Sequence, residues 1–173
     1  MHTGDTVTDS LGRNWTVGAS LGRGLWGSTW LLRGEDDSER VLKVAHARTD
    51  FPRDARLPDG LERACAQCVD EQASLLRKAT HPFLPRLEDR ILVTGRPALI
   101  LPRYRGTLAQ RLADGASLGN IARLLATVAD HAQALQVAGE VHGNLRPSNI
   151  LLKEDGQPVL SDALTPTAQA WRQ

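Results

Sequence analysis

The sequence lacks the features that mark most specialised classes of protein. Its 173 residues carry a formal net charge of only +1, which gives no reason to expect a nucleic-acid or an acidic-lipid surface. No apolar run approaches the ~18 residues that span a bilayer. Residues 1–10 are polar and lack the apolar core of a secretory signal. We therefore expect a cytoplasmic protein with no nucleic-acid partner and no membrane segment.

Cysteine and lysine are also scarce. Cys65 and Cys68 form a single CxxC in helix-like sequence, without the further ligands that a zinc site needs. We interpret them as reduced, half-buried helix residues. Of the 21 basic residues only Lys43, Lys78 and Lys153 are lysines. A lysine in a distinctive setting therefore departs from the preference of this chain for arginine.

The rest of the chain has the pattern of a globular domain in which strands precede helices. Residues 15–33 predict two β segments around a glycine-rich turn, and residues 41–45 predict a third strand. The spacing of apolar residues predicts a helix over residues 61–80, which Pro82 ends. Further along we expect, in order, strands at residues 90–94 and 98–101, helices at 107–113 and 118–137, and a small hairpin over 150–160.

The turn at residues 22–27 has the pattern G-x-G-x-x-G, with glycines at Gly22, Gly24 and Gly27. A dinucleotide-binding turn of this pattern leads into a helix, whereas here Thr29 and its neighbours continue as strand. A glycine turn between two strands lets backbone N–H groups approach phosphate oxygens. A glycine-rich hairpin without a ligand is the alternative interpretation.

Lys43 lies between apolar neighbours in the third expected strand. A half-buried ammonium group needs a partner, and Glu71 on the following helix is the expected one. The alternative is an exposed strand lysine and an unrelated helix glutamate.

The segment HGNLRPSNILL, residues 142–152, resembles the catalytic loop of the protein kinase superfamily, H-R-D-L-x-x-x-N, and matches it at His142, Leu145 and Asn149. Asp162 then follows in a setting that resembles the D-F-G segment of the family. Residues 71–82 resemble its helix C and the His-Pro after it. Together with the glycine turn and the strand lysine, these pieces stand in the order of the family. The chain thus resembles a bacterial Ser/Thr kinase-like domain.

The resemblance implies an α+β, protein-kinase-like fold. Its N-lobe would be a small antiparallel sheet with helix C, and its C-lobe would be helical and truncated. The expected ranges are a flexible N-terminal tail (residues 1–12), the N-lobe (13–101), and a hinge with a partial C-lobe that includes helices D and E (102–173). The activation segment and later helices of the family have no counterpart before Gln173. We therefore expect a piece of a longer protein or a shortened relative.

The resemblance also implies residues that handle ATP and Mg²⁺. In the family, the glycine turn covers the phosphates, the strand lysine holds the α- and β-phosphates, and a hinge binds adenine through its backbone. The positions implied for the nucleotide are Gly22, Gly24, Gly27, Thr29, Lys43, Glu71, Leu101 and Arg103. Those implied for magnesium are the oxygen donors Asn149 and Asp162. Since Pro102 has no N–H, the hinge register stays open.

Several positions depart from the family pattern. Asn144 stands in the place of the catalytic-base Asp, and a neutral carboxamide has no basicity to take the proton of a substrate hydroxyl. Arg146 stands where a Lys often contacts the γ-phosphate. Gly143 replaces an Arg, and Ala163 and Leu164 replace the Phe and Gly of D-F-G.

The resemblance implies Asn144, Arg146 and Lys43 at the catalytic positions. The departures from the family pattern favour a pseudokinase. Such a protein would bind ATP and regulate or scaffold an unidentified protein partner in signalling. Three alternatives stay open. The chain could be an active Ser/Thr protein kinase, a small-molecule phosphotransferase of the same fold, which the His142-Gly143 pair also resembles, or a structural remnant that binds nothing.

Overall fold

The computed structural model of the chain describes residues 1–78 and 81–171. Unit 1 comprises residues 1–78, 86–103 and 165–173, and unit 2 comprises residues 79–85 and 104–164. We describe each unit by itself. Among the helices of the described residues, none combines the length and the apolarity needed to cross a bilayer.

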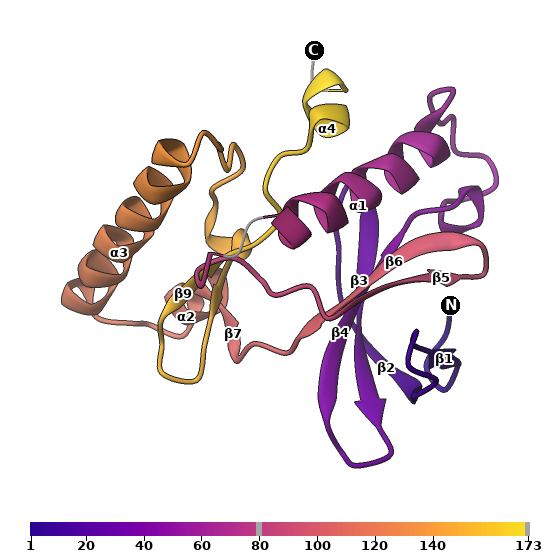
Figure 1. Ribbon diagram of the computed structural model, residues 1–173, viewed down its shortest axis with the longest axis horizontal. Coiled ribbons are helices and arrows are strands. Elements are labelled where there is room, and N and C mark those ends of the chain that lie inside the picture. The colour runs from indigo at the N-terminus through magenta and orange to yellow at the C-terminus, as the bar shows by residue number, and fades with distance from the viewer. Residues whose placement is uncertain (79–80, 172–173) are drawn as a thin grey trace. The chain divides into compact units, whose positions relative to one another are not determined.

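Unit 1 is built on a six-stranded antiparallel sheet with the strand order β1-β2-β3-β4-β6-β5 (Figure 1). Its strands are β1 (Thr6–Thr8), β2 (Asn14–Arg23), β3 (Gly27–Gly34), β4 (Glu39–Ala45), β5 (Asp89–Val93) and β6 (Arg96–Pro102). β1 lies inside the range expected to be a flexible tail, where it pairs Val7 with Trp15 of β2.

The two faces of this sheet bury different sets of side chains. Because neighbouring residues of a strand point to opposite faces, Leu42 and Val44 of β4 enter one core while Ala45 enters another. The first core contains Val7, Trp15, Val17, Leu32, Leu42, Val44, Ile91, Val93, Ala98 and Ile100. Lys43 alternates with Leu42 and Val44, so it belongs to the same face as Ala45.

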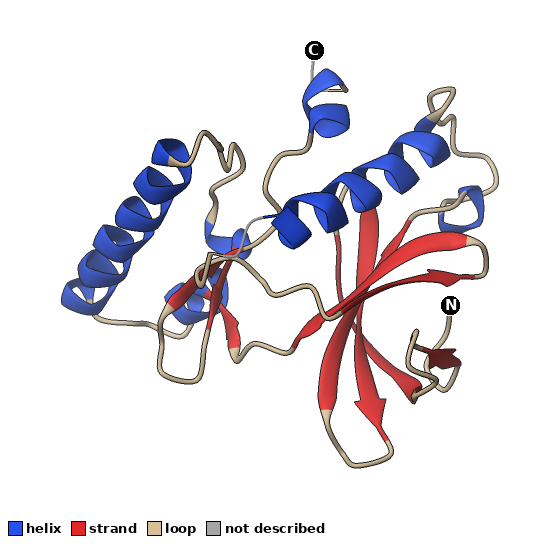
Figure 2. Ribbon diagram, viewed as in Figure 1, coloured by secondary structure: helices blue, strands red, loops and turns tan. Residues whose placement is uncertain are grey.

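Helix α1 (Leu61–Lys78) covers that second face (Figure 2). Cys65, Val69 and Ala73 of α1 pack there against Ala45 of β4 and Leu99 of β6. Both cysteines are free, as expected, and they are fully rather than half buried. The helix was expected to reach residue 80, but residues 79 and 80 lie outside the described residues.

Unit 2 combines helices with a three-stranded antiparallel sheet of order β7-β8-β9. Its elements are β7 (Gly106–Thr107), α2 (Leu108–Ala113), α3 (Leu118–Val137), the 3₁₀ helix η2 (Pro147–Asn149), β8 (Ile150–Leu152) and β9 (Pro158–Leu160). Val128 and Leu135 are the buried residues of α3, whereas Leu125 is 48% exposed.

The last described segment groups with unit 1 rather than with the partial C-lobe in which the sequence places it. Helix α4 (Pro166–Ala170) begins after Thr165, whose hydroxyl accepts a hydrogen bond from the Ala168 N–H at 3.3 Å. The main-chain and side-chain donors of Thr167 both reach the Glu71 carboxylate of α1. These contacts attach the segment to α1.

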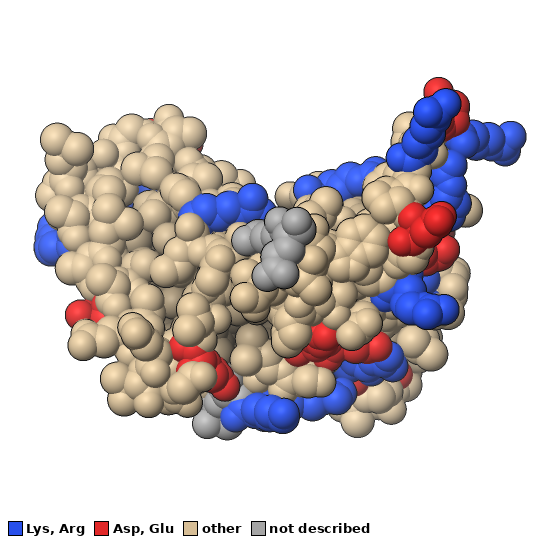
Figure 3. Space-filling model, turned by 90° about the horizontal axis from the view of Figure 1, so that it is seen from above, with Lys and Arg blue, Asp and Glu red and all other residues tan. Residues whose placement is uncertain are grey.

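Acidic and basic side chains lie beside one another on the face drawn in Figure 3, and no broad area there carries a single sign. This mixture agrees with the formal net charge of +1.

Candidate functional site

The glycine-rich turn joins β2 to β3, and its flanks bring expected site residues together. Gly22 pairs with Thr29 across the hairpin, and Thr29 pairs with Lys43 of β4. The Thr29 hydroxyl donates to the Gly22 carbonyl at 3.2 Å. At Gly27 a Cβ would clash with the Val44 carbonyl oxygen. The close approach of β4 therefore requires glycine at this position, whatever the turn binds.

Lys43 does find a partner on α1, but that partner is not the expected one. Its Nζ donates to Oε1 of Gln72 at 2.8 Å. The Glu71 carboxylate instead accepts from the Thr167 N–H at 3.0 Å and from the Thr167 hydroxyl at 2.7 Å. Successive helix residues point about 100° apart, so one residue faces β4 while its neighbour faces α4. The expected Lys43–Glu71 ion pair is therefore wrong for this structure.

The hydrogen bonds on Glu71 stabilise its charged form. Burial alone would raise the pKa of the carboxyl, but the donors of Thr167, with those of Thr165 and Gln67, hold its pKa below the usual value. In this structure the Glu71 carboxylate is hydrogen-bonded to Thr167, at the start of α4. Its role in nucleotide binding stays a prediction.

The tip of the glycine-rich turn also contacts the α4 segment. The ring of Trp26 packs edge-to-face on Trp171, with ring centroids 6.1 Å apart and planes at 82°. Trp26 also packs on the core that α1 forms with the sheet. The α4 segment thus touches both the turn and Glu71, which nothing in the sequence pattern indicated.

The expected hinge residues lie at the end of β6 and directly after it. Leu101 is half buried, pairs with Val41 of β4 and packs against the α1 core, whereas Arg103 is exposed. Pro102 pairs with Arg40 as the last residue of β6. Here unit 1 ends at Arg103 and unit 2 continues from Tyr104.

In unit 2 the catalytic-loop-like segment is organised around a buried histidine. His142 is 4% exposed, and its Nδ1 accepts from the Asn144 N–H at 3.3 Å. Its carbonyl accepts from the Leu164 N–H at 2.7 Å. Burial lowers the pKa of His142, while the Ser161 main chain and the charge of Asp162 act in the opposite direction. The neutral ring is therefore favoured, which leaves Nδ1 as an acceptor.

Asn144, Asn149 and Asp162 are brought together by hydrogen bonds. The Asn144 carboxamide donates from Nδ2 to the Asp162 carbonyl at 2.8 Å. The Asn149 carboxamide donates from Nδ2 to the Asn144 carbonyl at 2.9 Å. The Asn149 carbonyl in turn accepts from the Ser161 N–H at 2.8 Å. Arg146 is exposed, and its carbonyl accepts from the Asn149 N–H at 2.8 Å.

These contacts bear on whether the loop suits magnesium. Nδ2 of Asn149 donates to the Asn144 carbonyl, and its Oδ1 accepts from the Ser148 hydroxyl at 3.4 Å. Of the two ends, Oδ1 is the oxygen donor of the kind that Mg²⁺ prefers. Asp162 adopts φ = +58°, a left-handed conformation that costs a non-glycine residue about 1 kcal/mol or more. Within the described residues no cluster of three or more His, Cys, Asp or Glu forms a separate metal site. The oxygen atoms of Asn149 and Asp162 are of the kind that Mg²⁺ takes together with phosphate and water, and their role as ligands stays a prediction.

Two departures from the kinase pattern are coupled in space. Gly143 has φ = +66°, and a Cβ there would lie 3.0 Å from Cβ and 3.3 Å from Cδ2 of Leu164. The Leu164 side chain thus occupies space beside a residue that has no side chain. Glycine at one position and leucine at the other form a complementary pair.

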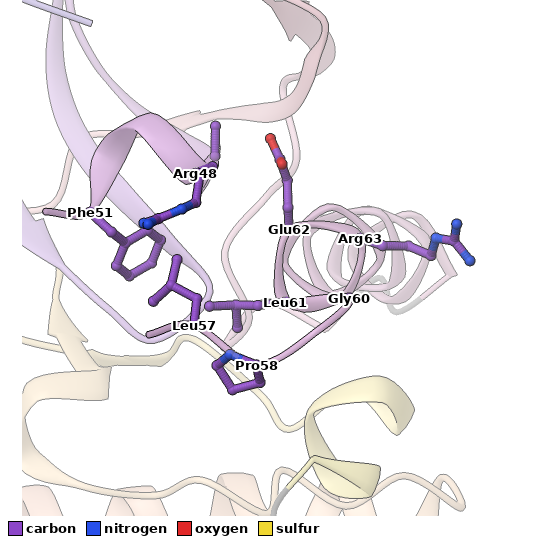
Figure 4. Close-up of a pocket in the computed structure, with 9 residues that line it drawn as sticks. Arg48, Phe51, Leu57, Pro58, Gly60, Leu61, Glu62 and Arg63 are labelled. Carbon is purple, nitrogen blue, oxygen red and sulfur yellow. The ribbon is translucent and has the colours of Figure 1, made fainter. Parts of the chain in front are cut away.

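A hollow of about 500 Å³ in unit 1 lies away from every expected site residue. It lies between the loop after β4 and the start of α1, and Figure 4 shows Phe51, Leu57, Pro58 and Leu61 around it, with the end of the Arg63 side chain pointing away. Its lining is mostly apolar.

Comparison with known proteins supports the kinase-like fold. The chain superposes on the solved structure described as "PpkA-294 apo form" with a TM-score of 0.75 and 16% sequence identity, over 99% of this chain and 65% of that one. The expected α+β, protein-kinase-like fold is confirmed. No protein-family model matches the chain.

Curated relatives are Ser/Thr protein kinases. The chain is 29% identical over 153 residues to serine/threonine-protein kinase PkaB of Streptomyces coelicolor and 28% identical over 164 residues to PkaA of the same organism. It is 28% identical over 146 residues to serine/threonine-protein kinase PknK of Mycobacterium tuberculosis. The matches to PkaB and PkaA cover 84% and 88% of this chain but only 33% and 30% of those proteins. The chain thus spans about a third of the length of PkaB and PkaA. Its resemblance to the protein kinase superfamily is confirmed.

Proposed function

We propose that the chain is an ATP-binding, protein-kinase-like domain that transfers phosphate poorly and acts by regulation or scaffolding. The observation that carries this proposal is the setting of Asn144. A carboxamide there has no basicity, and its Nδ2 is used as a donor to the Asp162 carbonyl. The residue is thus bound into the loop as an amide, and it does not stand ready to accept a proton.

The ATP-binding part rests on the residues retained in unit 1. A chain that uses arginine for most of its basic residues keeps a lysine at position 43, next to Thr29 and on the face covered by α1. A compact ammonium suits a phosphate site where a guanidinium would be too large. Lys43 would hold phosphate oxygens, the glycine-rich turn would cover them, and the backbone of residues 101–103 would bind adenine.

The magnesium part rests on unit 2. Asn149 and Asp162 would supply oxygen ligands, and the ion would neutralise phosphate charge. The left-handed backbone of Asp162 supports this assignment, because strained residues held in place by their surroundings are frequent at functional sites.

An active Ser/Thr protein kinase is the second candidate, and the names of the relatives favour it. Loss of a general base typically costs about 10²–10⁴-fold in rate, so slow transfer would survive without it. A small-molecule phosphotransferase would share the problem of Asn144. Protein and small-molecule substrates offered separately would distinguish these two.

The test compares transfer from γ-labelled ATP by the wild type and by Asn144→Asp. We expect negligible transfer by the wild type and a gain in the Asp variant. Wild-type turnover at about 1–100 s⁻¹, the ordinary range of kinases, would refute the proposal. An Asp at this position cannot donate to the Asp162 carbonyl, so we expect the variant to lose about 1–3 kcal/mol of stability. Melting temperatures are therefore measured on the same samples.

A further inference from the structure

A buried histidine directly follows Ala45, the last residue of β4, and belongs to none of the kinase-like motifs. His46 is 2% exposed and lies three positions after Lys43. Its ring packs edge-to-face on Phe51, with centroids 5.3 Å apart. A polar ring this deeply buried needs hydrogen-bond partners, and those it finds lie in the glycine-rich turn.

His46 binds two carbonyl groups of that turn. Its backbone N–H donates to the Trp26 carbonyl at 3.1 Å, and its Nε2 lies 2.9 Å from the Gly24 carbonyl oxygen. A carbonyl only accepts, so this contact requires the proton on Nε2. The third carbonyl, that of Gly27, accepts from the Gly24 N–H at 2.9 Å. The carbonyl oxygens of Gly24 and Trp26 are thus directed at the buried His46, and that of Gly27 is used within the turn.

The backbone N–H groups at the tip of the turn, unlike its carbonyl groups, are not used in hydrogen bonds among the described residues. Leu25 and Trp26 lie between the end of β2 and the start of β3, and within the described part of the chain their N–H groups make no hydrogen bond. Consecutive amides without partners, with the nearby carbonyls turned away, form a surface that attracts anions. If the carbonyl of Gly24 were released, it would be free to turn towards the same anion and oppose its binding.

The other side of the His46 ring faces charged groups without a hydrogen bond to them. Its Nδ1 lies 3.7 Å from Oδ2 of Asp50, and the same carboxylate accepts from Nη1 of Arg96 at 2.6 Å and from the Ala47 N–H at 2.9 Å. Arg23, inside the turn, donates from Nη2 to the Asp50 carbonyl at 2.6 Å. The 3₁₀ helix η1 (Arg48–Asp50) therefore anchors the turn through Arg23 and lies beside the ring.

We propose that His46 is a positioning residue for the phosphates of a bound nucleotide. By holding the Gly24 carbonyl inward, it keeps the amides of Leu25 and Trp26 directed at the ligand. This role rests on the proposed function, since it presumes that the glycine-rich turn receives phosphates. It predicts that His46 affects the binding of ATP but not of adenosine, which has no phosphate.

The test uses two matched substitutions. The side-chain amide of Gln reaches about as far as Nε2 of histidine, whereas that of Asn reaches only as far as Nδ1. His46→Gln can therefore keep the hydrogen bond to Gly24, and His46→Asn cannot. Calorimetric titration of each protein with Mg·ATP and with adenosine gives two dissociation constants per variant. Phe51→Leu, which alters the packing of the ring but leaves its hydrogen bond, is the control.

We expect His46→Asn to bind Mg·ATP about 5- to 10-fold more weakly than the wild type, the size of one lost hydrogen bond. Its affinity for adenosine should be unchanged, and His46→Gln and Phe51→Leu should bind Mg·ATP about as the wild type does. An Asn variant that loses affinity for both ligands equally, or that keeps full affinity for Mg·ATP, would overturn the positioning role alone. A wild type that binds neither ligand would overturn the proposed function as well.

Discussion

The pairing of Gly143 with Leu164 predicts a measurable cost for adding a single methyl group. In Gly143→Ala the alanine would have to adopt φ = +66°, and its Cβ would lie 3.0 Å from Cβ of Leu164. The left-handed backbone costs about 1–2 kcal/mol. Carbon atoms pack best at about 3.5–4.0 Å, and overpacking of this kind costs about 1–3 kcal/mol more. We expect a total loss of about 2–5 kcal/mol in the free energy of unfolding.

The same unit offers a control that separates the two contributions. Gly139 also has a positive φ, +81°, but a Cβ there would meet nothing within 4 Å. Gly139→Ala should therefore cost only the backbone part, about 1–2 kcal/mol. Replacing Leu164 by Gly removes the crowding, so a double-mutant cycle between positions 143 and 164 should give a coupling of about 1–3 kcal/mol.

The assay is urea unfolding followed by far-UV circular dichroism. Tryptophan fluorescence is unsuitable, because the four tryptophans, Trp15, Trp26, Trp30 and Trp171, all belong to unit 1, whereas Gly143 belongs to unit 2. If Gly143→Ala costs no more than Gly139→Ala, or if its cost persists in the Leu164→Gly background, the steric explanation of this pair is wrong.

The contacts of α4 and α1 give three further predictions. Thr167→Val removes the hydroxyl that donates to Glu71 and should lower the melting temperature by about 2–4 °C, whereas Thr49→Val, at an exposed position, should not. Because hydrogen bonds hold the pKa of Glu71 below its usual 4.5, its carboxylate stabilises the fold above that pH and loses this effect as the pH falls through the lowered value. The stability advantage of the wild type over Glu71→Gln should therefore shrink between pH 6 and pH 3, and a constant difference in melting temperature would contradict this. Burial raises the pKa of Cys65 to about 11. Mass spectrometry should therefore find Cys65 unmodified by iodoacetamide at pH 8 until urea is added. Rapid labelling of the native protein would contradict this, because it would show that the thiol is accessible.

Local patterns predicted the elements of the fold well. The strands around the glycine turn, the long helix ending at Val137 and the hairpin after Asn149 all lie close to where their apolar spacing and turn residues placed them. The sequence also indicated Lys43 and Asn144 as chemically distinctive. Lys43 is a lysine in a chain whose basic residues are mostly arginine, and Asn144 replaces the Asp of the kinase catalytic-loop pattern.

Long-range partners were harder to predict, and for a physical reason. Apolar periodicity shows that a helix faces a sheet, but a rotation of one residue decides whether Glu71 or Gln72 reaches Lys43. The attachment of α4 to Glu71 joins residues 96 positions apart, and no local pattern encodes such a contact. His46 was missed because a single histidine after a strand has no distinguishing sequence neighbours. Its importance emerges only from the turn carbonyls that surround it.

Calorimetric titration with Mg·ATP of the wild type and of Lys43→Ala tests the central claim most directly. We predict saturable binding by the wild type and a loss of about 10- to 100-fold in affinity in the variant, the range expected for a hydrogen bond to a charged group. Lys78→Ala, which removes another lysine of unit 1, should bind Mg·ATP as the wild type does. The absence of binding by the wild type, or equal affinities in the wild type and in Lys43→Ala, would contradict the account.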